Sequence, residues 1–561
     1  MRSRTLLRHS LRPAIAVIIA AATPAVMADT FTHVPFANPK FVGESSPNIL
    51  SPELIETAVA TGATRVENPT ALTDYYGYNN DGSLLPAAGA LPSSSAKIEA
   101  TKTEPDKNTY LVMPGLKGAD AHYNYGSHFL FQGHENGNGG NGYITRINLD
   151  ADSQHRVTVL ATNDVNGVAI PTLDGSTWYP WSGRLLFTAE GSGPGGGVWQ
   201  ATPSYPSIVQ DISGVMGRGG YEGIQADNDG NLWIVEDVGG KSGTTATHAK
   251  QPNSFVYRFI PNNRHDLVAG GKLQVLQLKS KAHDGAIVFH AGAADSDILS
   301  QDMKDLHTYG NNFNTQWITI HNTDTDGKTP FSANALAKAA GGTPLKRPEN
   351  GQFQPGTGFR TFVFAETGDT NLLTEAKDHG GFGAVLVLQQ NSASSNYGKL
   401  SLLYKGDAAH SGFDNVTFIS RNKVAFVEDA GDTLHTQRNA LDSGYILDMR
   451  ANYSDVRNEP VRFLAEGRDA SATVDSQFGG MQGFQNDGDN EITGIHVSDG
   501  DPTPNGLLGA KIPHLFKQGW RMFYTQQHGD NVTWEILPKE NCDRTEWHAL
   551  RNWNYDLDDE R

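Results

Sequence analysis

The residues of this chain that could carry out chemistry include an arginine and a glutamate two positions apart, Arg347 and Glu349. They close the stretch from Ala335 to Glu349, which predicts a short Ala-rich helix, a Gly-Gly stop and an extended segment. Because Pro348 disfavours the α conformation in the residue before it, we expect Arg347 to be extended. A guanidinium binds an oxyanion through paired hydrogen bonds, and a carboxylate is a ligand for hard cations. The pair therefore predicts an oxyanion site beside a bound cation.

Two further acids stand in segments whose composition suits a binding site. Glu222 follows Gly217-Arg-Gly-Gly-Tyr, where small residues allow the backbone or a substrate to approach closely. The alternative for this segment is a Gly-rich turn with a capping acid. Glu491 ends Asn486-Asp-Gly-Asp-Asn-Glu, which is dense in oxygen ligands and resembles a calcium loop without the ligand spacing of an EF-hand.

Five more acids share a position at the end of similar apolar runs. Convergent like charges repel each other unless a cation lies among them, so acids on equivalent strands predict a bound cation; the alternative is that each is simply solvated. Carboxylate ligands favour calcium, magnesium or manganese over zinc. Three histidines, His134, His379 and His528, could add nitrogen ligands, although a lone histidine is more often structural. The five acids are Glu135, Glu190, Glu236, Glu366 and Glu428.

The runs that carry these acids resemble one another and, with a sixth at 521–528, indicate six equivalent β-strands. Helical periodicity is scarce, and short β-rich runs end repeatedly in turn residues. We therefore predict an all-β fold, a six-bladed β-propeller in which the strand-end acids face the central channel. The expected domains are a signal peptide at 1–28, an irregular N-terminal wrap at 29–105, the propeller at 106–540 with a helical and loop insertion at about 241–345, and a polar tail at 541–561.

Composition excludes several classes of protein. The formal net charge is −18, and it becomes −22 without residues 1–28, which hold four arginines and no acid. An acidic surface argues against nucleic-acid binding and suits a protein that binds cations. Cys542 is the only cysteine, so an internal disulfide framework and multi-thiolate metal sites are excluded.

The first 28 residues are typical of an export signal. Four arginines precede an apolar, Ala-rich run, and Val26-Met-Ala28 offers small residues suited to cleavage. The run is too short for a membrane anchor, and no later segment is apolar enough to span a bilayer. We expect a Sec-type signal peptide cleaved after about Ala28 and a periplasmic or secreted protein.

Several of these segments together resemble the PhoX-type alkaline phosphatases, exported bacterial enzymes with a six-bladed propeller and a metal cluster in its channel. Ala339-Ala-Gly-Gly-Thr-Pro-Leu-Lys-Arg-Pro-Glu349 is similar to the family's Ala-Ala-x-x-x-Gly-Ala-Thr-Pro-x-x-Arg-Pro-Glu, with one residue fewer. Other family segments have counterparts in the same order, from about residue 110 to 530. These are Gly133-His-Glu135, Tyr179-Pro-Trp-Ser182, Gly217-Arg-Gly-Gly-Tyr-Glu222, Glu491-Ile-Thr-Gly494 and Thr525-Gln-Gln-His-Gly529.

The resemblance implies roles for particular residues. Arg347 becomes a contact to phosphate and a catalytic candidate, together with Glu349 and Glu222. The family places a cysteine that serves an iron centre where this chain has Phe187-Thr-Ala-Glu190, so calcium is expected, with magnesium or manganese also possible, and iron is in doubt. The implied metal ligands are Glu135, Glu190, Glu222, Glu349 and Glu491.

The function that the resemblance implies is metal-assisted hydrolysis of a small-molecule phosphate monoester by an exported enzyme. We expect a monomer with no nucleic-acid partner and no membrane span. Two alternatives remain open. One is a calcium-dependent propeller lactonase or esterase, because strands like Asp229-Gly-Asn-Leu-Trp233 also occur there. The other is a non-catalytic, calcium-stabilised propeller that binds a partner.

Overall fold

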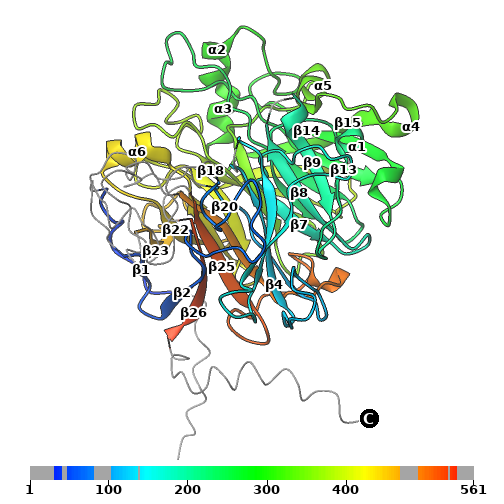
Figure 1. Cartoon of the computed structure of the whole chain (residues 1–561). Coiled ribbons are helices and arrows are strands. Elements are labelled where there is room, and N and C mark those ends of the chain that lie inside the picture. The colour runs from blue at the N-terminus through cyan, green and yellow to red at the C-terminus, as the bar shows by residue number, and fades with distance from the viewer. Residues whose placement is uncertain are drawn as a thin grey trace, which may run out of the picture.

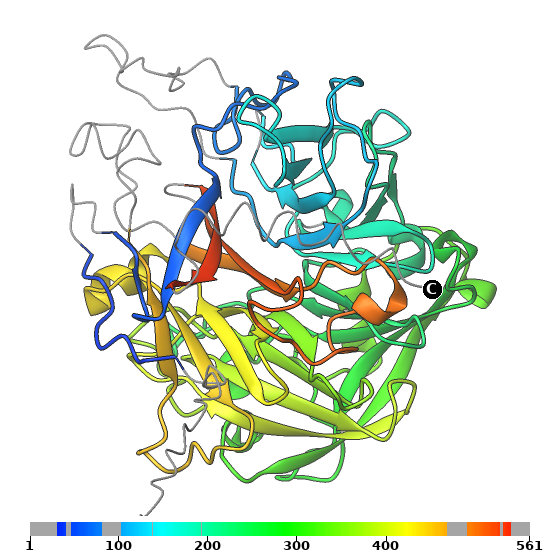
Figure 2. The ribbon, with the colours of Figure 1, turned by 90° about the horizontal axis from the view of Figure 1, so that it is seen from below.

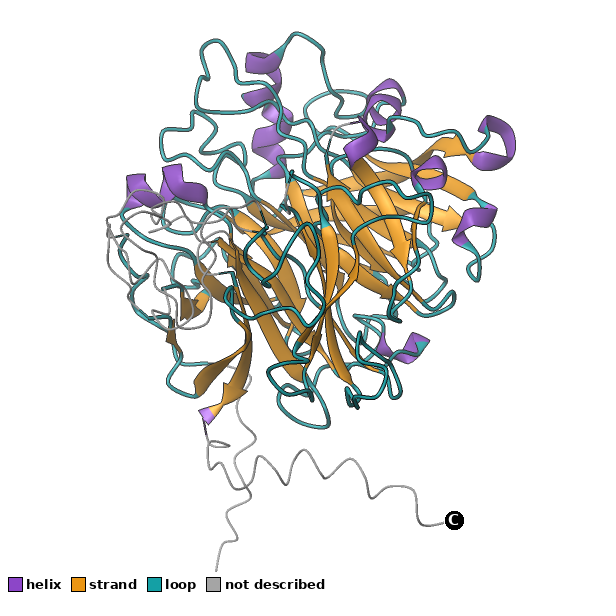
Figure 3. Ribbon diagram, viewed as in Figure 1, coloured by secondary structure: helices purple, strands orange, loops and turns teal. Residues whose placement is uncertain are grey.

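The protein is all-β in the part of the chain that the computed structural model describes (Figures 1 and 3). Strands fill the centre, and a few short helices lie at the periphery, so the predicted fold class is confirmed to this extent. The expected signal peptide and polar tail fall outside the described residues. Described are residues 31–40, 47–80, 103–136, 139–191, 193–467, 491–527 and 531–539.

Five antiparallel sheets surround a common centre in a propeller-like arrangement (Figure 2). Two of them follow chain order, the first being β3 (Thr109–Val112), β4 (His128–His134), β5 (Tyr143–Asn148) and β6 (Val157–Ala161). The second comprises β7 (Ser176–Tyr179), β8 (Arg184–Glu190), β9 (Gly196–Ala201) and β10 (Val209–Asp211).

The largest sheet has nine strands and contains two four-stranded groups. One group is β11 (Tyr221–Ala226), β12 (Leu232–Glu236), β13 (Val256–Pro261) and β14 (Gly271–Leu278); the other is β16 (Pro348–Phe353), β17 (Thr361–Glu366), β18 (Ala384–Gln390) and β19 (Tyr397–Lys405). The long strand β15 (Asn312–Asn322) joins them, because it pairs with β14 on one side and with β19 on the other. The two groups are therefore one hydrogen-bonded sheet.

The N-terminal segment completes the last two sheets. β1 (Ile49–Leu50) pairs with β23, and β2 (Leu54–Ala60) pairs with β26. The expectation of an irregular wrap at 29–105 is thus wrong for these two strands, whose short runs offered little periodic signal. The remaining strands are β20 (Phe413–Phe418), β21 (Lys423–Glu428), β22 (Ser443–Asp448), β23 (Val461–Ala465), β24 (Glu491–Ser498), β25 (Arg521–Gln527) and β26 (Val532–Pro538).

The expected insertion at 241–345 is smaller than predicted. β13 and β14 lie within it and belong to the sheet; the buried Arg258 interrupts the apolar run of β13 and hides it in the sequence. The rest of this range contains the strand β15, which also belongs to the sheet, and the helices α2 to α5. Ser332 caps α5 by accepting a hydrogen bond from the Ala335 N–H at 3.2 Å. The helices are α1 (Ser213–Met216), α2 (Ala294–Ile298), α3 (Gln301–Leu306), α4 (Thr323–Asp326), α5 (Ala333–Ala339) and α6 (Gly431–Arg438). None of these helices has the length and apolar character needed to cross a membrane.

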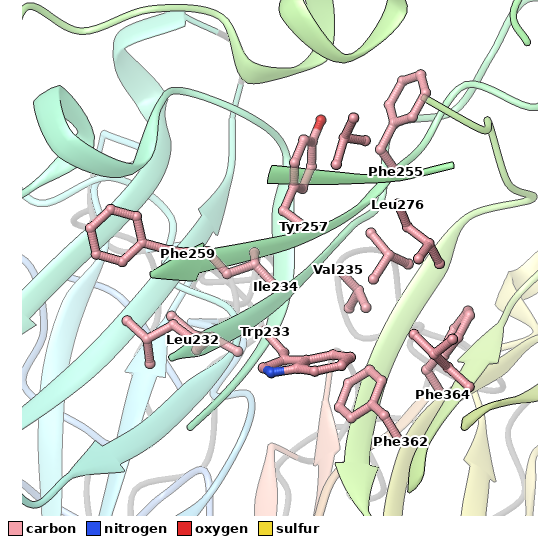
Figure 4. Close-up of a cluster of buried hydrophobic side chains, with 14 of the residues drawn as sticks. Leu232, Trp233, Ile234, Val235, Phe255, Tyr257, Phe259, Leu276, Phe362 and Phe364 are labelled. Carbon is pink, nitrogen blue, oxygen red and sulfur yellow. The ribbon is translucent and has the colours of Figure 1, made fainter. Parts of the chain in front are cut away.

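The six apolar runs predicted as equivalent strands are β4, β8, β12, β17, β21 and β25, and each lies second from the inner edge of its four-strand group. They read as continuous apolar runs because both of their faces are covered by neighbouring groups of strands. Trp233 of β12, for example, faces Phe362 of β17 across such an interface, with ring centroids 5.1 Å apart (Figure 4). This face-to-face packing forms the core and holds the innermost strands in position.

Candidate metal centre

The innermost strand of every group begins with an acid. The innermost strands contact one another around the centre, and all of these acids except Glu491 belong to shared groups of carboxylates. Two precede their strands by two or three residues, three are the second residue of their strands, and one is the first. They are Asp106 before β3, Asp174 before β7, Glu222 in β11, Glu349 in β16, Asp414 in β20 and Glu491 in β24.

A bulge aims three of these side chains. The pairing of β11 with β12 shifts between Tyr221 and Ile224, and the other two strands shift at the equivalent place. Such a bulge lets a strand re-aim a side chain. The bulges therefore explain why Glu222, Glu349 and Asp414 leave the sheet and point towards the other acids.

Small residues beside the acids let the inner strands converge. A Cβ at Gly175 would collide with the carbonyl oxygen of Glu222, and a Cβ at Gly223 would lie 2.9 Å from the Asn350 Cα. Real side chains do not tolerate such contacts, so the close approach of β7, β11 and β16 requires glycine at these two positions.

The second strands also place side chains near the acids of the innermost strands. In three of these strands, the side chain belongs to the residue that follows the predicted acid. Along a strand, successive side chains point to opposite faces. Glu236, Glu366 and Glu428 point into their sheets, and the following residues, Asp237, Thr367 and Asp429, take the position that Glu135 and Glu190 occupy elsewhere. The sequence-based expectation that all five strand-end acids face the centre is therefore wrong for Glu236, Glu366 and Glu428.

The contacts of these three glutamates show their structural role. Glu236 accepts hydrogen bonds from the Tyr257 hydroxyl at 2.9 Å and from the Asn334 amide at 3.0 Å. Glu366 accepts from the Lys346 N–H at 2.8 Å and pairs with buried His307 at 2.8 Å. Glu428 forms a salt bridge with Arg438 at 3.1 Å.

Eight carboxylates come together at the centre. They form four overlapping groups of three, and within each group one ligand atom of every residue lies within 4.8 Å of the others. Asp174, Glu190, Glu222 and Glu349 each belong to two groups, so the set is continuous. The groups are Asp106–Glu135–Asp174, Asp174–Glu190–Glu222, Glu190–Asp237–Glu349 and Glu222–Glu349–Asp414. We call these eight residues the carboxylate cluster.

Electrostatics make this cluster costly without a cation. Burial, and then repulsion between the neighbouring carboxylates, raise the pKa values of five members well above their usual range. The five are Asp174, Glu190, Glu222, Glu349 and Asp414. Two carboxylate oxygens, Asp174 Oδ1 and Asp414 Oδ2, are buried without a hydrogen-bond partner. Oxygens in that situation are the expected ligands of a hard cation, so the residues fit calcium, magnesium or manganese.

Arg347 lies at the edge of the cluster. Its Nε and Nη2 atoms donate to both oxygens of Asp237 at 2.6 to 3.0 Å, and Nη2 lies 3.5 Å from Glu349 Oε1. Burial alone would lower the pKa of Arg347, but Asp237 and Glu349 raise it, so the guanidinium stays charged. The backbone differs from the prediction: φ of Arg347 is +60°, a left-handed conformation in place of an extended one. Hydrogen bonds from the Thr367 N–H to Arg347 and from the Gly368 N–H to Lys346 hold the backbone there.

Other predicted residues lie elsewhere. Glu491 begins β24 and pairs in register with Gln527, whose amide donates to Glu135 at 2.6 Å, but it is in none of the four groups. His134 is buried between the Thr103 and Thr145 hydroxyls, and burial lowers its pKa to about 3, so it is a neutral structural residue. His379 also belongs to no group, and His528 lies outside the described residues.

Sequence reasoning missed half of the cluster: Asp106, Asp174, Asp237 and Asp414. It also missed Lys107, a buried lysine beside Asp106. A signal was present, since four inner strands carry an acid followed by Gly or Asn: Asp174-Gly, Glu222-Gly, Glu349-Asn and Asp414-Asn. The dipeptides are short and common in turns, which hides them in a single sequence.

Fold and site together define a class of protein: an all-β, propeller-like molecule with carboxylates and one arginine gathered where its innermost strands begin. The family model of alkaline phosphatase PhoX matches residues 247–502, a little under half of the chain. This range contains Arg347, Glu349 and Asp414 but not Glu222. The resemblance to PhoX inferred from the sequence is thereby confirmed.

Comparison with solved structures agrees with the family match. Pseudomonas fluorescens PhoX in complex with vanadate, a transition state analogue, is similar with a TM-score of 0.53 and 12% identity, over 91% of this chain and 98% of that chain. Chaetomium thermophilum Sqt1 bound to the N-terminus of the ribosomal protein L10 has a TM-score of only 0.32, with 11% identity over 73% of this chain and 80% of that chain. No curated protein matches the sequence. At this level of identity the likeness to the solved PhoX structure shows the fold alone.

Proposed function

We propose that this protein is an exported, metal-dependent hydrolase of phosphate monoesters. The observation that carries the proposal is the carboxylate cluster beside Arg347, in a chain whose central part matches the PhoX family. Phosphoryl transfer needs positive charge around the phosphoryl oxygens more than it needs covalent chemistry from the protein. Cations bound by the carboxylates, together with one guanidinium, would supply such an environment.

The finer features of the fold and setting belong to the same proposal. Counting β11–β14 and β16–β19 as separate groups gives six blades, with β15 as an added strand between two of them. Residues 1–28 are proposed to be a Sec-type signal peptide, and the mature protein to be a periplasmic or secreted monomer. Calcium is the proposed ion, and the substrate is a small-molecule phosphate ester.

The roles of the residues follow from their positions. The carboxylate cluster would hold the ions, and Glu222 and Glu349 are central because each belongs to two groups. Bound divalent cations would supply Lewis acidity towards the phosphoryl oxygens. Thr367 donates its hydroxyl hydrogen bond to Glu349 and fixes that carboxylate in place. Arg347, already held at the cluster by Asp237, would orient the phosphoryl group with its guanidinium.

The proposed ions would be held without a thiolate ligand. The only cysteine, Cys542, lies outside the described residues, and the residue before Glu190 is the buried Ala189. Every candidate ligand in the four groups is a carboxylate oxygen. This donor set supports calcium, magnesium or manganese over iron.

The test is to assay purified protein with an aryl phosphate and an aryl lactone, each with and without chelator, and to measure its metal content. We expect phosphate hydrolysis that chelation lowers by about 100-fold or more and that calcium restores. Chelator-sensitive lactone hydrolysis without phosphate hydrolysis would establish the lactonase alternative. Bound calcium with neither activity would establish a binding protein and overturn the proposed enzyme.

A further inference from the structure

Arg347 keeps a backbone conformation that the following residue disfavours. Its φ is +60°, although Pro348 favours an extended conformation in the residue before it. A residue other than glycine keeps a left-handed conformation only where the surrounding structure holds it there. The direction of the guanidinium depends on this conformation, because a return to an extended backbone would turn the side chain away from Asp237.

The guanidinium has one nitrogen left for a ligand. Nε and Nη2 donate to Asp237, whereas Nη1 has no hydrogen-bond partner among the residues that the structure describes. The Arg347 side chain is 20% exposed at the edge of the carboxylate cluster. A phosphoryl oxygen bound there would meet Nη1 only if the backbone and Asp237 together set the direction of the guanidinium.

A buried ion pair fixes the residue before Arg347. Lys346 Nζ lies 2.6 Å from Asp369 Oδ1, and the two side chains are 2% and 0% exposed. The Lys346 backbone is bound as well, because its N–H donates to Glu366 Oε1 at 2.8 Å and its carbonyl oxygen accepts from the Gly368 N–H at 3.1 Å. Lys346 is therefore held both by its backbone and by its side chain.

The same ion pair holds the chain that leads away from Asp237. Lys346 Nζ donates to the Lys250 carbonyl oxygen at 2.9 Å, and Asp369 Oδ1 accepts from the Lys250 N–H at 3.0 Å. The loop between Asp237 and Lys250 is therefore attached to the pair at its far end. Arg347 and Asp237, which bind each other, are thus tied through their own backbones to the same ion pair.

We propose that Lys346 and Asp369 are positioning residues that set the direction of the Arg347 guanidinium for a phosphoryl group. The inference rests on the proposed function. Neither residue belongs to the four carboxylate groups, so the pair acts on Arg347 and not on the ions. Two charges taken out of water cost free energy that their attraction repays only when the geometry is good, so a buried pair is weak evidence for stability. Selection of one conformation of Arg347 accounts for the pair.

The experiment removes the pair and measures its effect on substrate separately from its effect on stability. Lys346→Met and the double variant Lys346→Met/Asp369→Asn, which removes both charges, are compared with wild type at saturating calcium. For aryl phosphate hydrolysis we expect KM to rise by about tenfold or more, because a small displacement of the guanidinium is enough to weaken its contact. The calcium Kd, measured by isothermal titration calorimetry, should stay at the wild-type value.

Arg521→Met is the matched control. Arg521 of β25 forms a similar, largely buried pair with Glu535 of β26 at 2.6 Å, in a different sheet from β16. We expect this variant to have a lower Tm in thermal unfolding but the wild-type KM for the aryl phosphate. It therefore shows what the loss of an ion pair does when Arg347 is not affected.

A double-mutant cycle with Arg347→Met separates positioning from a general structural effect. Without the guanidinium nothing remains for the pair to position, so Lys346→Met should not raise KM further in the Arg347→Met background. A merely structural pair would raise KM by the same factor in both backgrounds.

The outcomes distinguish this inference from the proposed function. A wild-type KM in folded Lys346→Met, or equal factors in the two backgrounds, would overturn the inference while the proposed phosphatase stands. If neither variant folds in calcium, the pair serves the fold and the positioning role is wrong. If the wild type hydrolyses no aryl phosphate, the proposed function itself fails, and this inference fails with it.

Discussion

Single residues at the strand ends decide which acids can share an ion. In Glu236-Asp237 and Glu428-Asp429 the first acid makes hydrogen bonds inside the sheet, and Asp237 belongs to the carboxylate cluster. Both acids of each pair look equivalent in the sequence, because a change of one position along a strand reverses the face. The cluster members Glu135, Glu190, Glu222 and Glu349 were named from the sequence alone. Their role as ligands stays a prediction.

Removing one shared carboxylate should weaken ion binding without unfolding the protein. We expect Glu222→Gln or Glu349→Gln to abolish aryl phosphate turnover and to reduce the rise of Tm that calcium produces, because each residue belongs to two groups. Glu236→Gln is the matched control. It should lower Tm equally with and without calcium, since Glu236 bonds to Tyr257 and Asn334. Full turnover in both cluster variants would show that the site lies elsewhere.

Arg347 is expected to affect both substrate binding and the stability of the metal-free protein. Arg347→Met leaves Asp237 and Glu349 without their cation, and we expect a loss of about 3 kcal/mol in the unfolding free energy of metal-free protein. Arg347→Lys keeps a charge but not the paired hydrogen bonds, so KM for an aryl phosphate should rise while much of the stability returns. Urea unfolding and steady-state kinetics measure the two effects. An Arg347→Met enzyme with wild-type KM would exclude contact with phosphate.

At the scale of elements, the second strands could be predicted and the innermost strands could not. β12 and β17 are continuous apolar runs because neighbouring groups of strands cover both faces. The innermost strands contain Asp-Gly, Glu-Gly, Glu-Asn and Asp-Asn at their starts, which are typical of turns, and their bulges break the period of two. The residues that build the site are thus the ones that make its strands hard to recognise.

The close spacing of the innermost strands β11 and β16 leads to a further prediction. In Gly223→Ala the new methyl group would meet the Asn350 Cα at 2.9 Å, so β11 and β16 must move apart. We expect weaker calcium binding and a Tm lower by several degrees. Gly195→Ala is a fair comparison, because a Cβ there meets nothing within 4 Å. Calorimetric titration of both variants is the measurement, and equal calcium affinity in the two would contradict the role given to Gly223.

A second set of buried polar side chains, centred on Glu466, links β23, α6 and β25. Burial, followed by the charge of Asp442, raises the pKa of Glu466 to about 8, while His435 acts in the opposite direction. Gln526 donates to Glu466 at 3.1 Å, and Arg438 and His435 both pair with Asp442. Glu466 is therefore protonated in the folded protein at a pH where it would be ionised in the unfolded chain.

The raised pKa fixes the sign of a pH effect. The contribution of Glu466 to stability is present below about pH 4.5 and is lost as pH rises through about 8. We expect the unfolding free energy, measured with urea at saturating calcium, to fall from pH 5 to 9 in the wild type. Glu466→Gln should fall less steeply over this range. Parallel slopes in the two proteins would show that Glu466 does not titrate as stated.

At the scale of the whole molecule, the fold is closed by strands from opposite ends of the chain. β2 pairs with β26 in a register that begins with Leu54 opposite Pro538, and β1 pairs with β23. Sequence reasoning identified neither strand, because their partners lie more than 400 residues away and short strands take their stability from such partners. The joining of two groups by β15 was unpredictable for the same reason.

Removing the closing strands should destabilise the protein far more than removing what precedes them. A chain that starts at residue 61 lacks β1 and β2, which leaves the edge of β26 unpaired, and we expect its Tm to fall by about 10 °C or more, with aggregation. A chain that starts at Phe31 keeps both strands and should match the full-length protein. Differential scanning calorimetry compares them. Similar Tm values for both truncations would mean that β2 contributes little to closure.

The pairing of β2 with β26 would also decide when the proposed ions can bind. The carboxylate cluster draws on residues from Asp106 to Asp414, and the last sheet is complete only when residues near 538 reach those near 54. A nascent or unfolded chain holds these acids far apart and has no preference among cations. If the proposed metal centre holds, the ion would be selected in the surroundings where the ring closes, and folding in calcium-rich or calcium-poor media would yield molecules that carry different ions.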